Sequence, residues 1–96
     1  MPRPRSKRRV CGNPNSSYFK PAGIPIQELK ESPLHISEFE AIRLIDYLQL
    51  PQEEAASKMN VSQPTFSRIL KEGRRILAEA IVKGKAIKIE KSDNNE

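Results

Sequence analysis

Polar and basic side chains gather between residues 62 and 75, and their chemistry suits contact with nucleic acid. An arginine can pair bidentately with guanine and a glutamine with adenine, and each good pair contributes about 1 to 3 kcal/mol of discrimination between bases. Cations that face phosphates fix the position of a protein without reading sequence. The candidates are Ser62, Gln63, Thr65, Ser67, Arg68, Lys71, Arg74 and Arg75. The residues from Gln63 to Arg68 would reach bases, whereas the three later cations would face phosphates.

Two helices are predicted on either side of the segment Asn60-Val61-Ser62. The first runs roughly from Gln52 to Met59 and is opened by Pro51, whose missing N–H costs nothing at that position. Asn is common where a helix ends in a left-handed conformation, and Ser is a good N-cap for the helix that follows. Two short helices joined by so tight a turn form a helix-turn-helix, whose second helix fits the major groove of DNA.

Apolar side chains repeat along one face of the second helix, which is expected to cover residues 63–82 and to stop before Gly84. Ala55 in the first helix and Val61 in the turn would pack against that face. Gly73 costs about 1 kcal/mol relative to Ala in a helix interior, so we expect a bend or a close contact there. The apolar residues of this face are Phe66, Ile69, Leu70, Ile76, Leu77 and Ala80.

A further helix is predicted before these two, from Ser37 to about Leu48. Ser37 and Glu40 fit a capping box, in which the Ser side chain accepts from the third helical N–H and the Glu side chain reaches back. The spacing of three and four residues between its apolar side chains predicts one buried stripe. The stripe comprises Phe39, Ile42, Ile45 and Leu48, with Ala41 and Leu44 beside it.

The first 33 residues hold six of the eight prolines, which deny this stretch a long helix because each proline removes a backbone donor. The pattern therefore predicts an irregular arm, with short extended pieces at residues 8–11 and 18–20. We expect Ile24, Ile26 and Leu29 to anchor the arm on the core.

Basic side chains at the start of this arm form a second candidate site for nucleic acid. They are Arg3, Arg5, Lys7, Arg8 and Arg9. Flexible basic arms follow the phosphate backbone or enter a narrow minor groove. The other interpretation is a tail that only aids solubility. If about six cations contact phosphates, the log–log dependence of affinity on salt should have a slope of about −5.

The alternation in Ala86–Glu90 predicts a short strand, and Ser92–Glu96 should form a disordered tail. At 96 residues the chain has room for one small core. The expected fold class is mainly α: a three-helix helix-turn-helix domain with an irregular basic N-terminal arm and a short C-terminal strand. The expected division is residues 1–33 for the arm, 34–84 for the helix-turn-helix domain, and 85–96 for the strand and tail.

The net charge of +5 and the pI of about 9.6 favour polyanionic partners. The charge is segregated, with +6 on residues 1–30, −4 on residues 31–60 and +3 on residues 61–96. No apolar run is long enough to span a membrane, and the basic start does not lead into a secretory signal. A single cysteine, Cys11, fits a reducing compartment, so we expect the protein in the cytoplasm.

Residues suited to catalysis or metal binding are few. His35 is the sole histidine and has no nucleophile near it in the sequence, so a loop or capping role is expected rather than general-base work. Cys11 and His35 alone cannot complete a structural zinc site, which needs four ligands. The four glycines are scattered and form no phosphate-binding loop. We therefore expect no enzyme activity, no catalytic residues, no metal and no cofactor.

Short blocks of sequence follow one another along the chain in a recognisable order. They are Arg3-Pro4-Arg5, residues 8–11, residues 19–25, residues 38–44, residues 52–56, Val61-Ser62, residues 65–70 and Gly84-Lys85-Ala86. This order resembles a small prokaryotic family of predicted DNA-binding proteins of unknown physiological role. The helical part is similar to the promoter-reading region four of bacterial sigma factors, so the resemblance implies a compact helical DNA-binding domain. The chain departs from the family pattern at Ser37, Asn60 and Gly73.

Two functions from different classes follow from these observations. In the first, the protein is a sequence-specific binder of double-stranded DNA and a transcriptional regulator, which could act as a homodimer with half-sites about 34 Å apart. In the second, the sigma-like helices form a protein-interaction module, for example on RNA polymerase, and nucleic-acid affinity is nonspecific. A dimer could form if the strand at residues 86–90 pairs with the arm near Val10 or with the same strand of a second copy, because an exposed strand edge tends to find a partner.

Overall fold

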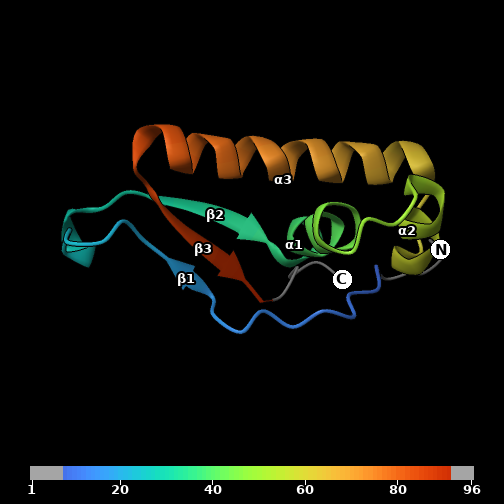
Figure 1. Ribbon diagram of the computed structural model, residues 1–96, viewed down its shortest axis with the longest axis horizontal. Coiled ribbons are helices and arrows are strands. Elements are labelled where there is room, and N and C mark those ends of the chain that lie inside the picture. The colour runs from blue at the N-terminus through green and yellow to red at the C-terminus, as the bar shows by residue number, and fades with distance from the viewer. Residues whose placement is uncertain (1–7, 92–96) are drawn as a thin grey trace, which may run out of the picture.

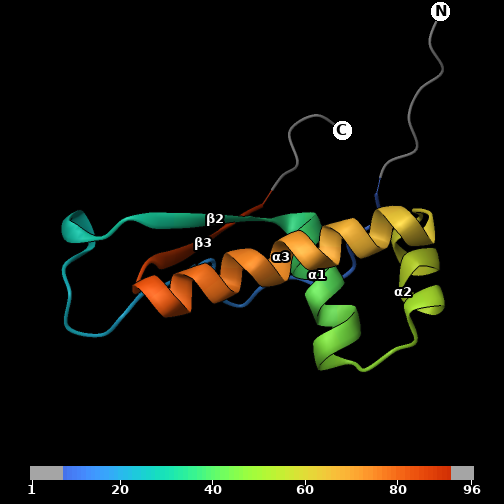
Figure 2. The same ribbon diagram turned by 90° about the horizontal axis from the view of Figure 1, so that it is seen from above.

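A computed structural model describes residues 8–91, which form three α-helices and a three-stranded sheet. In chain order the elements are β1 (Tyr18–Phe19), the 3₁₀ turn η1 (Ile26–Glu28), β2 (Glu31–His35), α1 (Ile36–Ile42), the π-helical turn η2 (Arg43–Tyr47), α2 (Gln52–Met59), α3 (Gln63–Lys83) and β3 (Ala86–Glu90). The long helix α3 lies across one side of the molecule, over the sheet at one end and over α1 and α2 at the other (Figures 1 and 2). The prediction of a mainly helical chain is confirmed, with a larger sheet than expected.

The central strand of the sheet is β3, which lies between β1 and β2. It runs antiparallel to β1, with Tyr18 opposite Lys88, and parallel to β2 from Glu31 opposite Ala86 onwards. The predicted strand over residues 86–90 is confirmed, as is the extended piece at Tyr18, whereas residues 8–11 form no strand. Because β3 has a partner strand on each side, it is not available for the pairing with a second copy that the sequence analysis considered for a dimer.

Sequence patterns did not predict β2, and the expected boundary after residue 33 falls inside it. Its side chains alternate, with Ser32 and Leu34 buried and Glu31, Pro33 and His35 exposed. Proline is normally a sign against a strand, but it is tolerated at a sheet edge where no N–H is required. The backbone N–H of His35, two residues on, points away from β3 and donates to Glu38 Oε1 at 2.9 Å. Pro33 therefore faces the same outer edge, where its missing donor costs nothing.

The N-cap of the first helix lies two residues earlier than predicted and is a different side chain. His35 is the N-cap residue, with extended dihedrals, and Glu38 takes the third helical position. The predicted capping box of Ser37 and Glu40 is wrong: Ser37 is buried, and Glu40 points to another part of the chain. The reason is that β2 keeps the chain extended up to His35, so the change to helical dihedrals happens there.

The helix continues into η2, and this π-helical turn changes which side chains are buried. Ala41 and Leu44 are fully buried, while Phe39, Ile42 and Ile45 are only partly buried. Leu48, expected at the end of the stripe, is 43% exposed. A π turn has more residues per turn than an α-helix and so rotates later residues off the stripe.

The expected anchors of the N-terminal arm are also partly wrong. Ile24 is 37% exposed and Ile26 is 54% exposed, and only Leu29 is half-buried. They lie in the loop around η1 at one end of the molecule, away from the helices α1 and α2 (Figure 1). Hydrogen bonds, not these side chains, attach the arm to the core.

Hydrogen bonds fix the chain from residue 8 onwards to the body of the protein, and we call residues 8–17 the strap. The N–H of Arg9 donates to Met59 O at 3.0 Å, and Ser17 O accepts from the N–H of Ile89 at 2.8 Å. Between these points, the N–H groups of Cys11 and Gly12 donate to the two carboxylate oxygens of Glu40, each at 3.1 Å. The strap therefore joins the end of α2, the middle of α1 and the central strand.

Glu40 is almost completely buried, with 1% of its surface exposed. Its carboxylate also accepts from Arg43 Nε at 2.8 Å and from Arg43 Nη2 at 3.0 Å. Burial by itself would raise the pKa of Glu40, but these hydrogen bonds from Arg43 and from the strap outweigh it. The pKa of Glu40 consequently lies below its ordinary value of 4.5, and the group is ionised at neutral pH.

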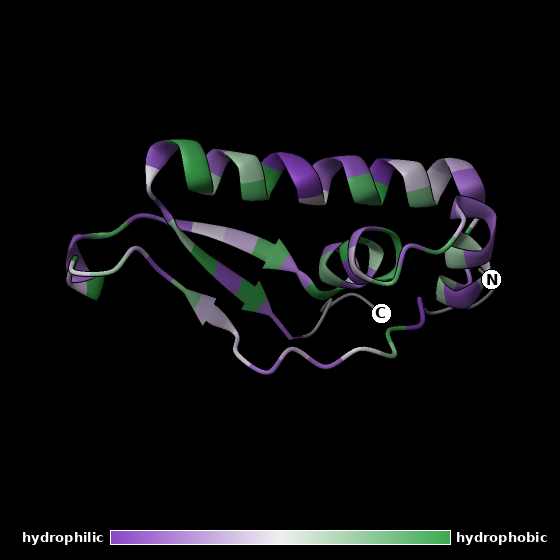
Figure 3. Cartoon of the chain, viewed as in Figure 1, coloured by the Kyte–Doolittle hydropathy of each residue, from purple (hydrophilic) through white to green (hydrophobic). Residues whose placement is uncertain are grey.

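Two clusters of apolar side chains form the core. One, built around Leu44, Met59 and Phe66, lies between α1, α2 and the first half of α3. The other, built around Leu34, Ile76 and Ile89, lies between the sheet and the second half of α3. Ile42 packs against both clusters, so the apolar support of α3 is continuous. Figure 3 shows hydrophobic and hydrophilic residues alternating along α3.

Gly73 lies between the two clusters, where α3 meets α1. A Cβ added there would lie 3.1 Å from both Glu38 Cβ and Ile42 Cδ1, closer than side chains normally approach. The close contact predicted at this glycine is confirmed.

Replacement of Glu40 by Gln should lower the free energy of unfolding at pH 7 by about 3 kcal/mol, because the half-buried Arg43 and two strap N–H groups lose their charged acceptor. The pKa of Glu40 is lowered by folding, so its contribution is present above the ordinary value and is lost as pH falls through the folded value. Urea unfolding from pH 7 to pH 3 should show the two proteins converging in acid. An equal difference at every pH would contradict this role.

Replacement of Gly73 by Val should cost about 1 to 3 kcal/mol of unfolding free energy, because the added methyl groups overpack the contact with α1. The control is Ala78→Val, an exposed position on the same helix, where only the lower helix propensity of Val acts and the cost should be a few tenths of a kcal/mol. Equal costs at the two positions would show that α1 and α3 do not meet closely at Gly73.

Candidate nucleic-acid interface

The turn between α2 and α3 has the geometry that the sequence predicts. Asn60 adopts the left-handed conformation, with φ 61° and ψ 43°. The N–H of Asn60 donates to Ser57 O at 3.0 Å, and the N–H of Val61 donates to Ala56 O at 3.1 Å. Ser62 is the N-cap of α3, since its side chain accepts from the N–H of Thr65 at 3.3 Å. The corner therefore spans residues 60–62 and is closed by its own backbone.

Small side chains let α2 approach α3 closely. Ala55 and Ala56 are buried, and Met59 at the end of α2 has no exposed surface. They pack with Phe66 and Ile69 of α3, while Val61 in the turn contacts the same cluster. Because these side chains are buried in one cluster, they hold the direction in which α3 projects from α2.

The outward face of α3 carries the polar residues that the sequence singled out. Gln63, Ser67, Arg68 and Lys71 are exposed, and Thr65 is half-buried. Thr65 Oγ1 accepts from Arg68 Nη2 at 3.4 Å and contacts Ser62 Oγ at 3.1 Å, so these three side chains form a local group at the start of the helix. Within residues 8–91, neither Arg68 nor Lys71 forms a salt bridge.

The later cations of this helix are paired with carboxylates. Arg74 Nη2 lies 2.6 Å from Asp46 Oδ1, and its Nε lies 3.1 Å from Asp46 Oδ2. Arg75 pairs with Glu72 at 2.8 Å and with Glu79 at 3.1 Å. The hydrogen bonds to Glu72 raise the pKa of Arg75. All these groups are at least partly exposed, so each pair contributes little to stability and can be exchanged for a phosphate at low cost.

A hollow of about 340 Å³ lies between the start of α2 and the outward face of α3. Its polar lining comprises Gln52, Ser67, Arg68, Lys71 and Arg74. Three cations line it, of which Arg74 is paired with Asp46, and no carboxylate among residues 8–91 is part of the lining, which suits an anion such as a backbone phosphate. The sequence analysis did not single out Gln52. Its position as the first residue of the helix that precedes α3 could have marked it as a candidate for backbone contact.

The basic arm is represented in the described residues by Arg8 and Arg9, and both have intramolecular partners. Arg8 Nη1 donates to Ser37 Oγ at 3.3 Å, and Arg9 Nη2 donates to Ser57 O at 3.2 Å. A cation beside the last carbonyls of α2 also complements the helix dipole. Both side chains remain exposed, and Arg9 lies at the end of α2, next to the turn. Arg3, Arg5 and Lys7 lie outside the described residues.

Metal binding and membrane insertion were the other possibilities considered for the described residues. In residues 8–91, no cluster of three or more side chains could hold a metal ion. His35 caps α1 and lies 3.3 Å from Glu38 Oε1 through its Nδ1. In the same range, no helix has the length and apolar character needed to cross a membrane.

Comparisons with known proteins identify relatives without an assigned activity. A family model described as "Protein of unknown function DUF134" matches residues 1–96. UPF0251 protein DET0218 of Dehalococcoides mccartyi is 51% identical over 90 residues, which is 94% of this chain and 77% of the relative. UPF0251 protein TTE1845 of Caldanaerobacter subterraneus subsp. tengcongensis is 52% identical over 90 residues, 94% of this chain and 76% of the relative. No solved structure matches the chain.

Replacement of Ser62 by Ala should lower the free energy of unfolding by about 1 kcal/mol, because the N–H of Thr65 loses its capping acceptor. Ser67→Ala, in the exposed interior of the same helix, is the control and should be neutral or slightly stabilising because Ala has the higher helix propensity. Thermal and urea unfolding measure both. A neutral Ser62→Ala would show that this side chain does not cap α3.

Proposed function

Because the chain belongs to the family described as protein of unknown function DUF134, whose description names no activity, we propose a function from its own geometry. The function is sequence-specific binding of double-stranded DNA by α2 and α3 acting as a helix-turn-helix, in a transcriptional regulator. The resemblance of the helices to region four of sigma factors belongs to the same proposal.

The observation that carries the proposal is the projection of α3 from a tight, densely packed corner, with an outward face that holds Arg68 and Lys71. A helix placed in this way can enter the major groove with its N-terminal residues against base edges. Arg68, which has a neutral hydrogen-bond partner, Thr65, is free to offer two donors to guanine. Gln63 and Ser67, both exposed, flank it on the first turns of the helix.

Contacts to the DNA backbone would come from two sides of this helix. The hollow beside Gln52 and Lys71 can hold one phosphate. On the other side of the turn, Arg9 lies against the end of α2, so the chain enters the described structure beside the start of α3. A basic arm that begins there is suited to the phosphates or the minor groove next to the site read by α3.

A protein-interaction module is the second candidate, and exposed apolar residues favour it. Tyr47 is 78% exposed and Leu48 is 43% exposed, at the end of η2 before α2. A partner such as RNA polymerase could cover them, and the basic residues would then supply only nonspecific affinity for nucleic acid.

Replacement of Arg68 by Ala separates the two functions. We expect the preference for a selected duplex over random DNA to fall by about 1 to 3 kcal/mol, because a bidentate pair to a base is lost, while binding to random DNA persists. Fluorescence anisotropy with both duplexes measures it, and Lys58→Ala, an exposed cation on α2, is the matched control. An unchanged preference in Arg68→Ala would support the interaction module instead.

Replacement of Lys71 by Ala should weaken binding to all duplexes alike and reduce the log–log salt slope by about 1, because one phosphate contact is lost. The measurement is anisotropy at several salt concentrations between low and physiological ionic strength. A loss confined to one sequence would assign Lys71 to a base instead of a phosphate.

A further inference from the structure

A trough with apolar walls opens on the side of the molecule where the strap crosses the sheet and α1. Two adjoining hollows, of about 540 and 260 Å³, make it up. They share four wall residues, Phe19, Phe39, Ile42 and Ile89, which come from β1, α1 and β3. Proteins bind small molecules in clefts of this size whose walls are mostly apolar and whose polar groups are few.

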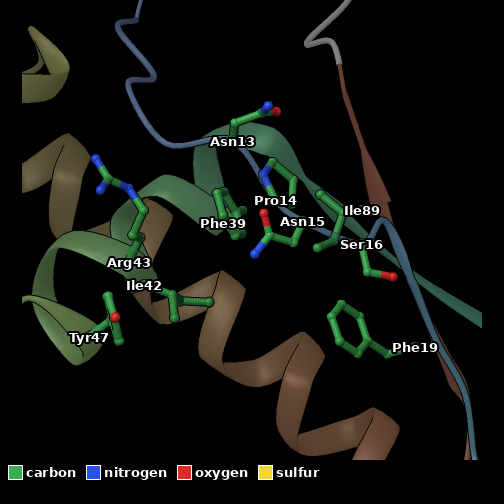
Figure 4. A pocket seen from close by; sticks show the side chains of 10 residues that line it. All are labelled: Asn13, Pro14, Asn15, Ser16, Phe19, Phe39, Ile42, Arg43, Tyr47 and Ile89. Carbon is green, nitrogen blue, oxygen red and sulfur yellow. The ribbon is translucent and has the colours of Figure 1, made fainter.

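The two parts of the trough differ in chemistry. The inner hollow ends on Leu34, Leu77 and Ile87, and every residue that lines it is apolar. The outer hollow adds the polar strap residues Asn13, Asn15 and Ser16, with Arg43 and Tyr47 at one end and Phe19 at the other (Figure 4). The two hollows together therefore suit an occupant with an apolar body and one polar group at the end beside Arg43.

The charge at the opening favours an anionic group over a cationic one. Arg43 is the sole charged residue that lines the outer hollow within the described chain. Its partner Glu40 is 1% exposed, whereas the Arg43 side chain is 25% exposed, so the positive member of the pair is the one that faces solvent. Glu40 uses the Nε and Nη2 of Arg43, and the guanidinium has further N–H donors that can serve a ligand.

The ring of Phe19 in the trough wall is 50% exposed, so an apolar occupant would remove apolar surface from water there.

We propose that this trough binds a small amphipathic monocarboxylate, with an aliphatic or aromatic body of about ten carbon atoms between Phe39, Ile42 and Ile89 and its carboxylate beside Arg43. The site does not depend on DNA binding. It lies under the strap, which continues through Gly12 and Cys11 to the end of α2.

The test uses octanoate as the probe, below the concentration at which it forms micelles, and follows methyl resonances by NMR. Octanoate should shift the methyl signals of Ile42, Leu77 and Ile89 and reach saturation. Octylamine, which has the same chain with the opposite charge, should bind at least fivefold more weakly. Equal binding of the two would overturn the anionic class.

Two exposed serines supply matched variants for the same titration. Ser16→Trp places a large ring at the opening and should weaken octanoate binding at least tenfold, whereas Ser57→Trp on α2 should leave it unchanged. Shifts that grow without saturation, or that affect the exposed Ile81 and Val82 as strongly as the trough, would overturn the site and indicate general adsorption.

Discussion

The buried carboxylate of Glu40 is the interaction on which the arrangement of this small protein depends. A buried charge costs several kcal/mol unless it is paired and hydrogen-bonded, and Glu40 meets that requirement with one guanidinium and two backbone N–H groups. The two backbone donors belong to the strap. The hydrogen bonds that compensate the charge of Glu40 therefore also attach the N-terminal segment to α1. The strap in turn holds β1 against β3 and Arg9 against the end of α2.

The long helix α3 unites the two halves of the fold. Its first half rests on α1 and α2 through Phe66, and its second half rests on the sheet through Ile76. Gly73 between them lets α1 come close enough for Ile42 to join both clusters. The outward face of α3 is thereby left free of core contacts and carries the cations that we propose contact DNA. Leu77, in the second half of α3, lines the trough.

Much of the helical part could be predicted because its signals are local. The bounds of α2, the left-handed Asn60, the cap at Ser62 and the strand β3 each follow from a few neighbouring residues. The errors arise where distant segments decide. Glu40 binds a strap 28 residues away, and Asp46 pairs with Arg74 across the same separation. Neighbouring residues in the sequence reveal neither partner. The strand β2 was missed for another reason: its side chains alternate between buried and exposed, but Pro33 argued against a strand.

The central claim is that the face of α3 after Ser62 reads base pairs, and selection of bound fragments from random duplex DNA at moderate ionic strength tests it most directly. If α3 reads bases, repeated rounds should enrich one short motif, and the purified protein should bind that motif more tightly than unselected duplex. If the selected pool stays as diverse as the starting pool while the protein is folded, α3 does not read sequence and the account is contradicted.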